Sequence, residues 1–197
     1  MNFRLHTLIL VGFLSTALHA ETSETTPAPP VIAAKAYILL DANSGRVLAE
    51  QNADERLEPA SLTKIMTAYI VFQELSKGTL HLDDMATISL KAAKQEGSRM
   101  FAEPNSSVAI ENLLKGMIIA SGNDASVALA EQISGEEAAF AEIMNQNASR
   151  LGMSNTHFMN SMGLPSPGHY ASARDIATLA RAMINEFPER RVPLRKS

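Results

Sequence analysis

The stretch Ser61-Leu-Thr-Lys-Ile-Met-Thr-Ala-Tyr-Ile-Val-Phe-Gln-Glu-Leu75 decides the fold. Laid out at 100° per residue, it predicts a helix whose polar positions Thr63, Thr67 and Glu74 share one narrow strip. Lys64 lies on the face of Ser61 instead, beside an apolar stripe. A helix that is apolar around most of its circumference is buried. We therefore predict that the Lys64 side chain is held in the interior.

Ser61 and Lys64 stand three residues apart, so they are neighbours on one helix face. Serine is a weak nucleophile and needs a base within hydrogen-bond reach. Burial lowers the pKa of a lysine and turns it into such a base. The helix N-terminus adds N–H groups that stabilise an oxyanion. The pattern predicts acyl transfer, although an N-capping Ser61 and a surface Lys64 would also fit these four residues.

A second polar element, Ser121-Gly-Asn123, falls between two predicted helices. Its hydroxyl is suited to passing a proton between Lys64 and a leaving group. The Asn123 amide is suited to holding a substrate carbonyl or to positioning Lys64. Serine, glycine and asparagine also favour capping turns, which is the alternative interpretation.

The remaining sequence predicts an α+β fold with two strands at its start. Apolar β-formers at 35–40 and 46–50 flank the turn Asp41-Ala-Asn-Ser-Gly45, which favours an antiparallel hairpin. Helical patterns, each ended by glycine or proline chemistry, follow at 110–119, 124–133, 136–151 and 172–187. The stretches 79–107 and 155–170 are predicted to be irregular.

The N-terminus predicts export. Residues 1–20 combine a basic start, a short apolar run and an alanine before polar residues, which is typical of a signal peptide. A retained anchor is the alternative. Residues 21–33 are proline-rich and predict an extended linker.

Composition excludes several classes of function. A net charge of -4 gives no reason to expect a nucleic-acid partner, and the basic residues gather only in the 190–197 tail. The chain has no cysteine, which excludes disulfides and thiolate metal sites. Its five histidines lack metal-ligand spacing, so we expect neither a metal nor a cofactor.

Pro59-Ala-Ser-Leu-Thr-Lys-Ile-Met-Thr-Ala-Tyr69 and Ile119-Ala-Ser-Gly-Asn-Asp-Ala-Ser-Val-Ala128 resemble the low-molecular-mass penicillin-binding proteins, and more narrowly the serine D-alanyl-D-alanine carboxypeptidases. The similarity covers residues 34–189, expected to be a partial catalytic domain before a divergent 190–197 tail. The resemblance implies that Ser61 is the acylated nucleophile and Lys64 its base. It also implies that Ser121 transfers a proton and that Asn123 completes the second motif.

The resemblance implies a serine β-lactamase/DD-peptidase-like transpeptidase fold. The hairpin and the helical subdomain of that fold are expected here, without its C-terminal strands. Such enzymes remove the terminal D-alanine from peptidoglycan stem peptides and are acylated by β-lactams. We therefore expect these two classes of partner and a location in the periplasm or cell envelope.

The sequence departs from the family after residue 189. The family's Lys-Thr-Gly motif, which helps bind the substrate carboxylate, does not occur, nor does its amphipathic membrane helix. We expect little or no activity from this chain alone, and a frameshift or truncated gene model would explain the tail. A non-catalytic remnant or cell-wall-binding fragment is the main alternative. A serine β-lactamase fits less well, because Glu142-Ile-Met-Asn145 has the wrong spacing for a deacylating base.

Overall fold

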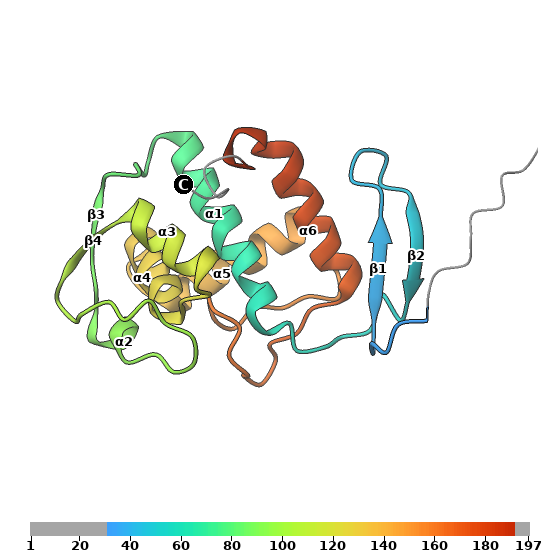
Figure 1. The fold of residues 1–197 in the computed structure, drawn as a ribbon, viewed down its shortest axis with the longest axis horizontal. Coiled ribbons are helices and arrows are strands. Elements are labelled where there is room, and N and C mark those ends of the chain that lie inside the picture. Colours follow the sequence, from blue (N-terminus) through green and yellow to red (C-terminus); the bar gives the residue numbers. More distant parts are fainter. Residues whose placement is uncertain (1–30, 192–197) are drawn as a thin grey trace, which may run out of the picture. The chain divides into compact units, whose positions relative to one another are not determined.

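The computed structural model describes residues 31–191, and all elements below lie in one compact unit that begins at Ala33 (Figure 1). The predicted signal peptide, residues 1–20, lies outside the described residues, as do 21–30 of the predicted linker and 192–197 of the tail. Within 31–191 no helix combines the length and apolar character that crossing a membrane requires.

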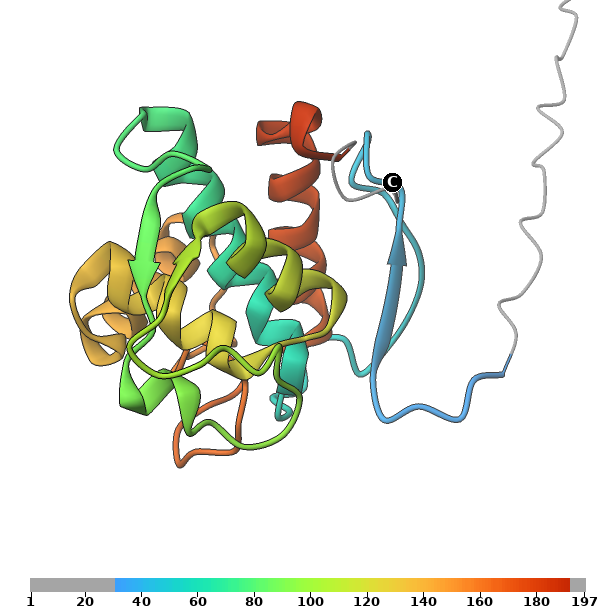
Figure 2. The same cartoon turned by 60° about the vertical axis from the view of Figure 1, so that its left-hand side comes forward.

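The predicted hairpin is present. Strands β1 (Tyr37–Leu40) and β2 (Val47–Gln51) pair antiparallel, with a register shift between Leu39 and Leu40. The turn forms as its sequence predicts: the Asp41 carboxylate accepts hydrogen bonds from the backbone and hydroxyl of Ser44. The hairpin stands beside the last long helix, and β1 packs against that helix (Figure 2).

Helix α1 (Lys64–Lys77) is the centre of the helical part. It contacts the four other long helices: α3 (Ile110–Ile119), α4 (Asn123–Ser134), α5 (Glu137–Arg150) and α6 (Ala173–Glu186). Every residue from Met66 to Phe72 is buried, which confirms that this helix lies in the interior. Gly78 ends it in the left-handed conformation, with φ of +72°.

The other long helices match their predicted bounds to within about one residue, and α4, α5 and α6 each have a chemical end signal. Gly135 follows α4 with φ of +80°, and Gly152 follows α5 with φ of +76°. At the start of α6, the Ser172 hydroxyl accepts from the Asp175 backbone N–H, as the sequence predicts. Eight consecutive residues of α4, Asn123–Ala130, are buried.

Two expectations need correction. The α-helix begins at Lys64 rather than Ser61, because residues Ala60–Thr63 form a 3₁₀ turn, η1. The 79–107 stretch is also more regular than predicted. It holds a small antiparallel sheet of β3 (Met85–Thr87) and β4 (Ser107–Ala109), and a short helix α2 (Leu90–Ala93). Elements this short carry too little periodicity to be read from sequence. The chain's last described element is a second 3₁₀ turn, η2 (Pro188–Arg191).

Candidate active site

Ser61 is exposed on η1, and backbone packing fixes that turn. Ala60, just before it, has φ of +47°, an uncommon conformation for a residue with a side chain. Gly163 packs directly against it: a Cβ on Gly163 would lie 1.8 Å from the Ala60 carbonyl oxygen. Gly163 itself has φ of +93°. Ser61 therefore lies on a turn whose partner position accepts only glycine.

Lys64 is buried, with 7% of the residue exposed, which confirms that its side chain is held in the interior. Its Nζ donates to Ser61 Oγ at 3.2 Å and to the Met162 carbonyl oxygen at 2.8 Å. Burial lowers the pKa of Lys64 from 10.5 to about 8. An amine with this pKa, in contact with a serine hydroxyl, is equipped to accept its proton.

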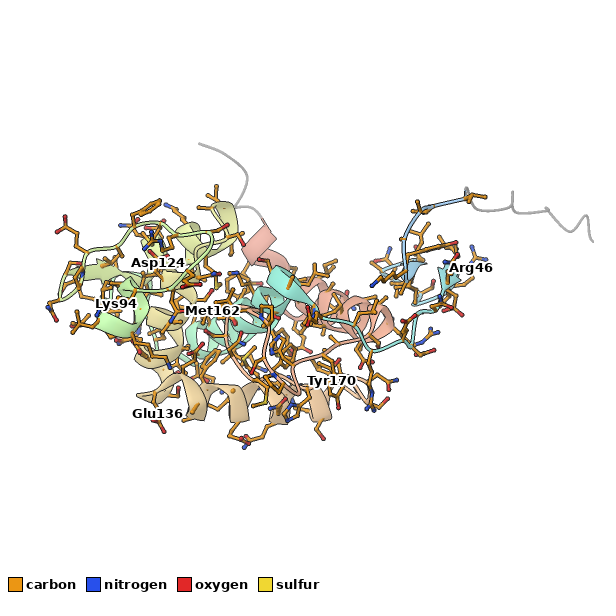
Figure 3. All side chains as sticks on the ribbon, turned by 90° about the horizontal axis from the view of Figure 1, so that it is seen from below. Arg46, Lys94, Asp124, Glu136, Met162 and Tyr170 are labelled. Carbon is orange, nitrogen blue, oxygen red and sulfur yellow. The ribbon has the colours of Figure 1, made fainter. Side chains whose placement is uncertain are left out.

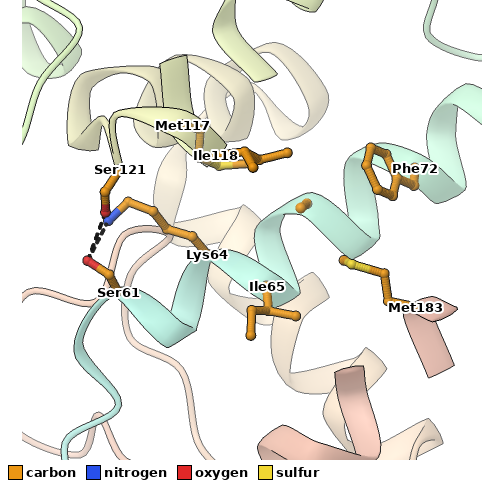
Figure 4. Close-up of a pocket in the computed structure, with 9 residues that line it drawn as sticks. Ser61, Lys64, Ile65, Phe72, Met117, Ile118, Ser121 and Met183 are labelled. Carbon is orange, nitrogen blue, oxygen red and sulfur yellow. Dashed lines mark hydrogen bonds between the residues drawn. The ribbon is translucent and has the colours of Figure 1, made fainter. Parts of the chain in front are cut away.

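Ser121 comes to the same point from the turn between α3 and α4. Its Oγ donates to Ser61 Oγ at 3.0 Å. Ser61, Lys64 and Ser121 point toward one another in Figure 4, although Ser121 is 60 residues from Ser61 in sequence. Ser121 has φ of +55°, so its turn holds a residue in the left-handed region. The structure thus unites three of the four predicted site residues.

Asn123 is the fourth, and it does not join them. It is buried, and its Nδ2 donates to the Glu96 carbonyl oxygen at 2.6 Å, while its backbone N–H donates to Ser98 O at 2.7 Å. Within residues 31–191 no hydrogen bond links Asn123 to Lys64. The amide holds the 96–98 segment against the Ser121 turn.

Asp124 strengthens the same junction. Its carboxylate is fully buried and accepts from the backbone N–H groups of Met100, Ala102 and Ala125. A buried carboxylate is stable only when hydrogen bonds replace its water. Asp124 therefore fastens the 100–102 segment to the start of α4, next to Ser121.

An apolar pocket of about 230 Å³ adjoins the three groups (Figure 4). Beyond Ser61, Lys64 and Ser121 it is lined by Ile65, Ala68, Phe72, Met117, Ile118 and Met183. Lys64 is the single cation in this lining. Among residues 31–191 no three His, Asp or Glu side chains gather in a way that would hold a metal ion.

Sequence reasoning missed a third wall of the site, the segment 159–169, here called the 159–169 loop. Besides the Met162 carbonyl, it offers the Ser161 carbonyl, which accepts from Thr67 Oγ1 at 2.6 Å, and His169, whose Nε2 lies 2.9 Å from Thr63 Oγ1. Figure 3 shows Met162 among the side chains packed around α1. Thr63 and Thr67, predicted as a polar strip, are fully buried and face this loop. The available signal was that strip, which implies polar partners inside the core.

An exposed serine in contact with a buried lysine and a second serine, on an α+β fold with a central buried helix, is typical of serine acyl-transfer proteins of the penicillin-binding, DD-peptidase class. The sequence profile of the peptidase S11 family, D-alanyl-D-alanine carboxypeptidase, matches residues 23–193. The chain belongs to this family.

The chain is similar to members of this family in both sequence and structure. The chain is 46% identical over 183 residues to D-alanyl-D-alanine carboxypeptidase DacC of Escherichia coli K12, covering 90% of this chain and 45% of the relative. The crystal structure of the carboxypeptidase DacD from Francisella tularensis aligns with a TM-score of 0.81 and 47% identity, over 83% of this chain and 40% of that one. Penicillin binding protein 5 from Haemophilus influenzae aligns with a TM-score of 0.80 and 44% identity, over 83% of this chain and 48% of that one. The chain thus spans just under half the length of these relatives.

Proposed function

We propose that this chain carries the Ser61–Lys64–Ser121 part of a serine D-alanyl-D-alanine carboxypeptidase site. The observation that supports it most directly is the buried Lys64 amine, 3.2 Å from Ser61 Oγ with a pKa lowered to about 8. At pH 7, about one amine in ten with that pKa is neutral, against about one in three thousand at the ordinary value. Burial therefore multiplies the population of active base several hundredfold.

The proposed reaction follows from these positions. Neutral Lys64 accepts the Ser61 hydroxyl proton as Oγ attacks the carbonyl carbon of the penultimate D-alanine in a peptidoglycan stem peptide. Ser121 relays that proton to the amine of the leaving D-alanine, because its Oγ contacts Ser61 Oγ. Water then hydrolyses the acyl-serine ester. A β-lactam acylates Ser61 by the same attack, and its ring opens.

Substrate binding needs a second cation beside the pocket. The terminal carboxylate of a D-Ala-D-Ala peptide needs a cation, and the pocket lining offers only Lys64, which the reaction uses as a base. We therefore expect the 197-residue chain, assayed by itself, to be acylated slowly. Asn123 is proposed to act from behind the site, by holding the 96–98 segment in place.

We further propose that the chain is exported to the bacterial cell envelope. The signal-peptide pattern at 1–20 and the linker composition at 21–33 support this, ahead of a domain at 34–189 and a basic tail at 190–197. N-terminal sequencing of the protein recovered from a periplasmic fraction is the test. A mature start at or near Glu21 is expected, and recovery of uncleaved chain in the cytoplasm contradicts it.

A fluorescent penicillin tests the chemistry. We expect slow, covalent labelling of the wild-type chain that maps to Ser61 by peptide mass spectrometry and disappears in Ser61→Ala. Ser44→Ala, an exposed serine in the hairpin turn, is the matched control and keeps the label. A complete lack of labelling in a folded protein favours the non-catalytic, cell-wall-binding alternative. Rapid turnover of nitrocefin favours a β-lactamase.

A further inference from the structure

His169 is a buried histidine that the proposed reaction does not use. It is the last residue of the 159–169 loop, is 5% exposed, and its ring lies edge-on to the ring of Phe158. Both ring nitrogens have partners: Nδ1 accepts from the Met159 backbone N–H at 2.9 Å, and Nε2 lies 2.9 Å from Thr63 Oγ1. Because Nδ1 is an acceptor, the ring is the neutral Nε2–H tautomer and donates to Thr63.

This imidazole joins two pieces of the site. Thr63 directly precedes Lys64, and Met159 begins the loop whose Met162 carbonyl accepts from Lys64 Nζ at 2.8 Å. We propose that His169 is a positioning residue for Lys64, which by joining Thr63 to the 159–169 loop holds the Met162 carbonyl against the lysine amine and keeps water from it. The proposal rests on the proposed role of Lys64 as the base.

The remaining contacts of the loop explain why one imidazole matters. Ser161 is held from the far side by Glu137, whose Oε1 accepts from its backbone N–H and hydroxyl and whose Oε2 pairs with Lys91 at 2.8 Å. The Ser161 and Met162 end of the loop is therefore fixed by α5 and α1. At the other end, His157 bonds the Gly168 carbonyl and pairs with Tyr170, while His169 supplies the hydrogen bond that ties this end to Thr63, directly before α1.

The charges around the two groups give the sign of the effect. Burial alone lowers the pKa of Lys64, whose polar neighbours Ser61, Ser121 and the Met162 carbonyl are all uncharged. Burial and then His157 lower the pKa of His169, and Glu58 raises it. Loosening the loop admits water to Lys64, and solvation returns the pKa of the amine toward 10.5.

The pKa of Lys64, read from the ¹³Cε shift in lysine-labelled protein, tests the proposal without any assay of activity. Lys64→Arg assigns the resonance. We expect the pKa of Lys64 to increase by about one unit in His169→Ala and in Thr63→Val. The double variant should show no further increase, because both substitutions remove the same hydrogen bond. His169→Gln retains a donor for Thr63 and is expected to stay near wild type. His81→Ala, an exposed histidine paired with Asp84, is the matched control and leaves the pKa of Lys64 unchanged.

Acylation by fluorescent penicillin supplies the second readout. A one-unit increase slows His169→Ala about tenfold at pH 7 and leaves its rate near wild type at pH 10, where the amine is neutral in both. An equal loss at every pH, or an unchanged Lys64 pKa in folded variants, overturns the proposal. If His169→Ala does not fold, Thr63→Val, which keeps the side-chain shape, decides the question. If the wild type is never labelled, the proposed function fails, while the ¹³C titration still reads the positioning role.

Discussion

The wall around Lys64 and the β1–β2 hairpin are attached to the molecule in opposite ways. The 159–169 loop meets α1 and the residue before it through buried hydrogen bonds, two of which involve the fully buried side chains of Thr63 and Thr67. The hairpin meets α6 through exposed ion pairs of Arg174 with Glu50 and Asp54, and through bonds from Arg181 to the turn carbonyls of residues 42 and 43. Removing one partner of a buried polar contact costs much stability, whereas removing one partner of an exposed ion pair costs little. The region that sets the chemistry is therefore the one least tolerant of change.

Gly163→Ala is expected to have the largest effect, because it changes the closest contact between the 159–169 loop and η1. The new Cβ would lie 1.8 Å from the Ala60 carbonyl oxygen, and the backbone has φ of +93°, so the loop must move off η1. We expect a loss of about 3 kcal/mol or more in unfolding free energy, and no penicillin labelling. Urea unfolding measures the first. Gly78→Ala is the matched control: it has a similar φ of +72° with nothing within 4 Å, and should cost about 1 kcal/mol. Equal losses in the two variants would contradict the close contact.

Lys64→Met tests what the 159–169 loop costs the molecule, because it removes the amine that the loop keeps from water. We expect loss of labelling together with a gain of about 1–3 kcal/mol in stability at pH 7, since a site that buries an amine is strained for function. The pKa of Lys64 is lowered in the folded state, so the unfolded chain binds more protons between pH 8 and 10.5. Wild-type stability should therefore rise across that window, relative to Lys64→Met. A flat difference between the two proteins would show that Lys64 is solvated.

Thr67→Val tests one buried hydrogen bond with the side-chain shape preserved. Removing the donor leaves the Ser161 carbonyl without its 2.6 Å partner, which should cost about 1–2 kcal/mol. Thr79→Val is the matched control, because its hydroxyl bonds Glu74 on the surface, and it should cost less than about 0.5 kcal/mol. Thermal unfolding of both variants measures the difference, and a reversed order would refute the contrast between buried and exposed contacts.

Arg174→Gln is expected to have the smallest effect. Its two carboxylate partners are exposed, so solvent and salt already weaken the pairs. We expect the unfolding midpoint to fall by at most about 2 °C at low salt, and the two proteins to coincide at 1 M NaCl. A large decrease that persists at high salt would show that the hairpin is held as firmly as the 159–169 loop.

Much of the fold was predictable because its helices carry their own end signals. The α3 helix was predicted over its observed bounds, and the interior position of Lys64 followed from the apolar surroundings on one helix. Ser121 could be placed near Ser61 only through the family resemblance. No local sequence pattern indicates contact between residues that are 60 positions apart.

The rest of the site depends on partners that sequence periodicity does not encode. The Met162 carbonyl is a backbone group, and every residue has one, so no residue type signals its role. The sequence indicates nothing of His169 beyond its lack of metal-ligand spacing, because its partner Thr63 lies 106 residues earlier. Asn123 was predicted to hold a substrate carbonyl or to position Lys64, and its Nδ2 bonds the Glu96 carbonyl, one of several backbone acceptors within reach of an amide next to a turn.

The distance in sequence between Thr63 and His169 also sets when the site comes into being. A ribosome makes Ser61 and Lys64 early, and it must add roughly a hundred further residues before the 159–169 loop can cover them. Until then Lys64 is an ordinary hydrated ammonium group and Ser61 an ordinary alcohol. On the proposed function, the emerging chain therefore carries this pair in an inert form, and its reactivity begins only when the loop has docked.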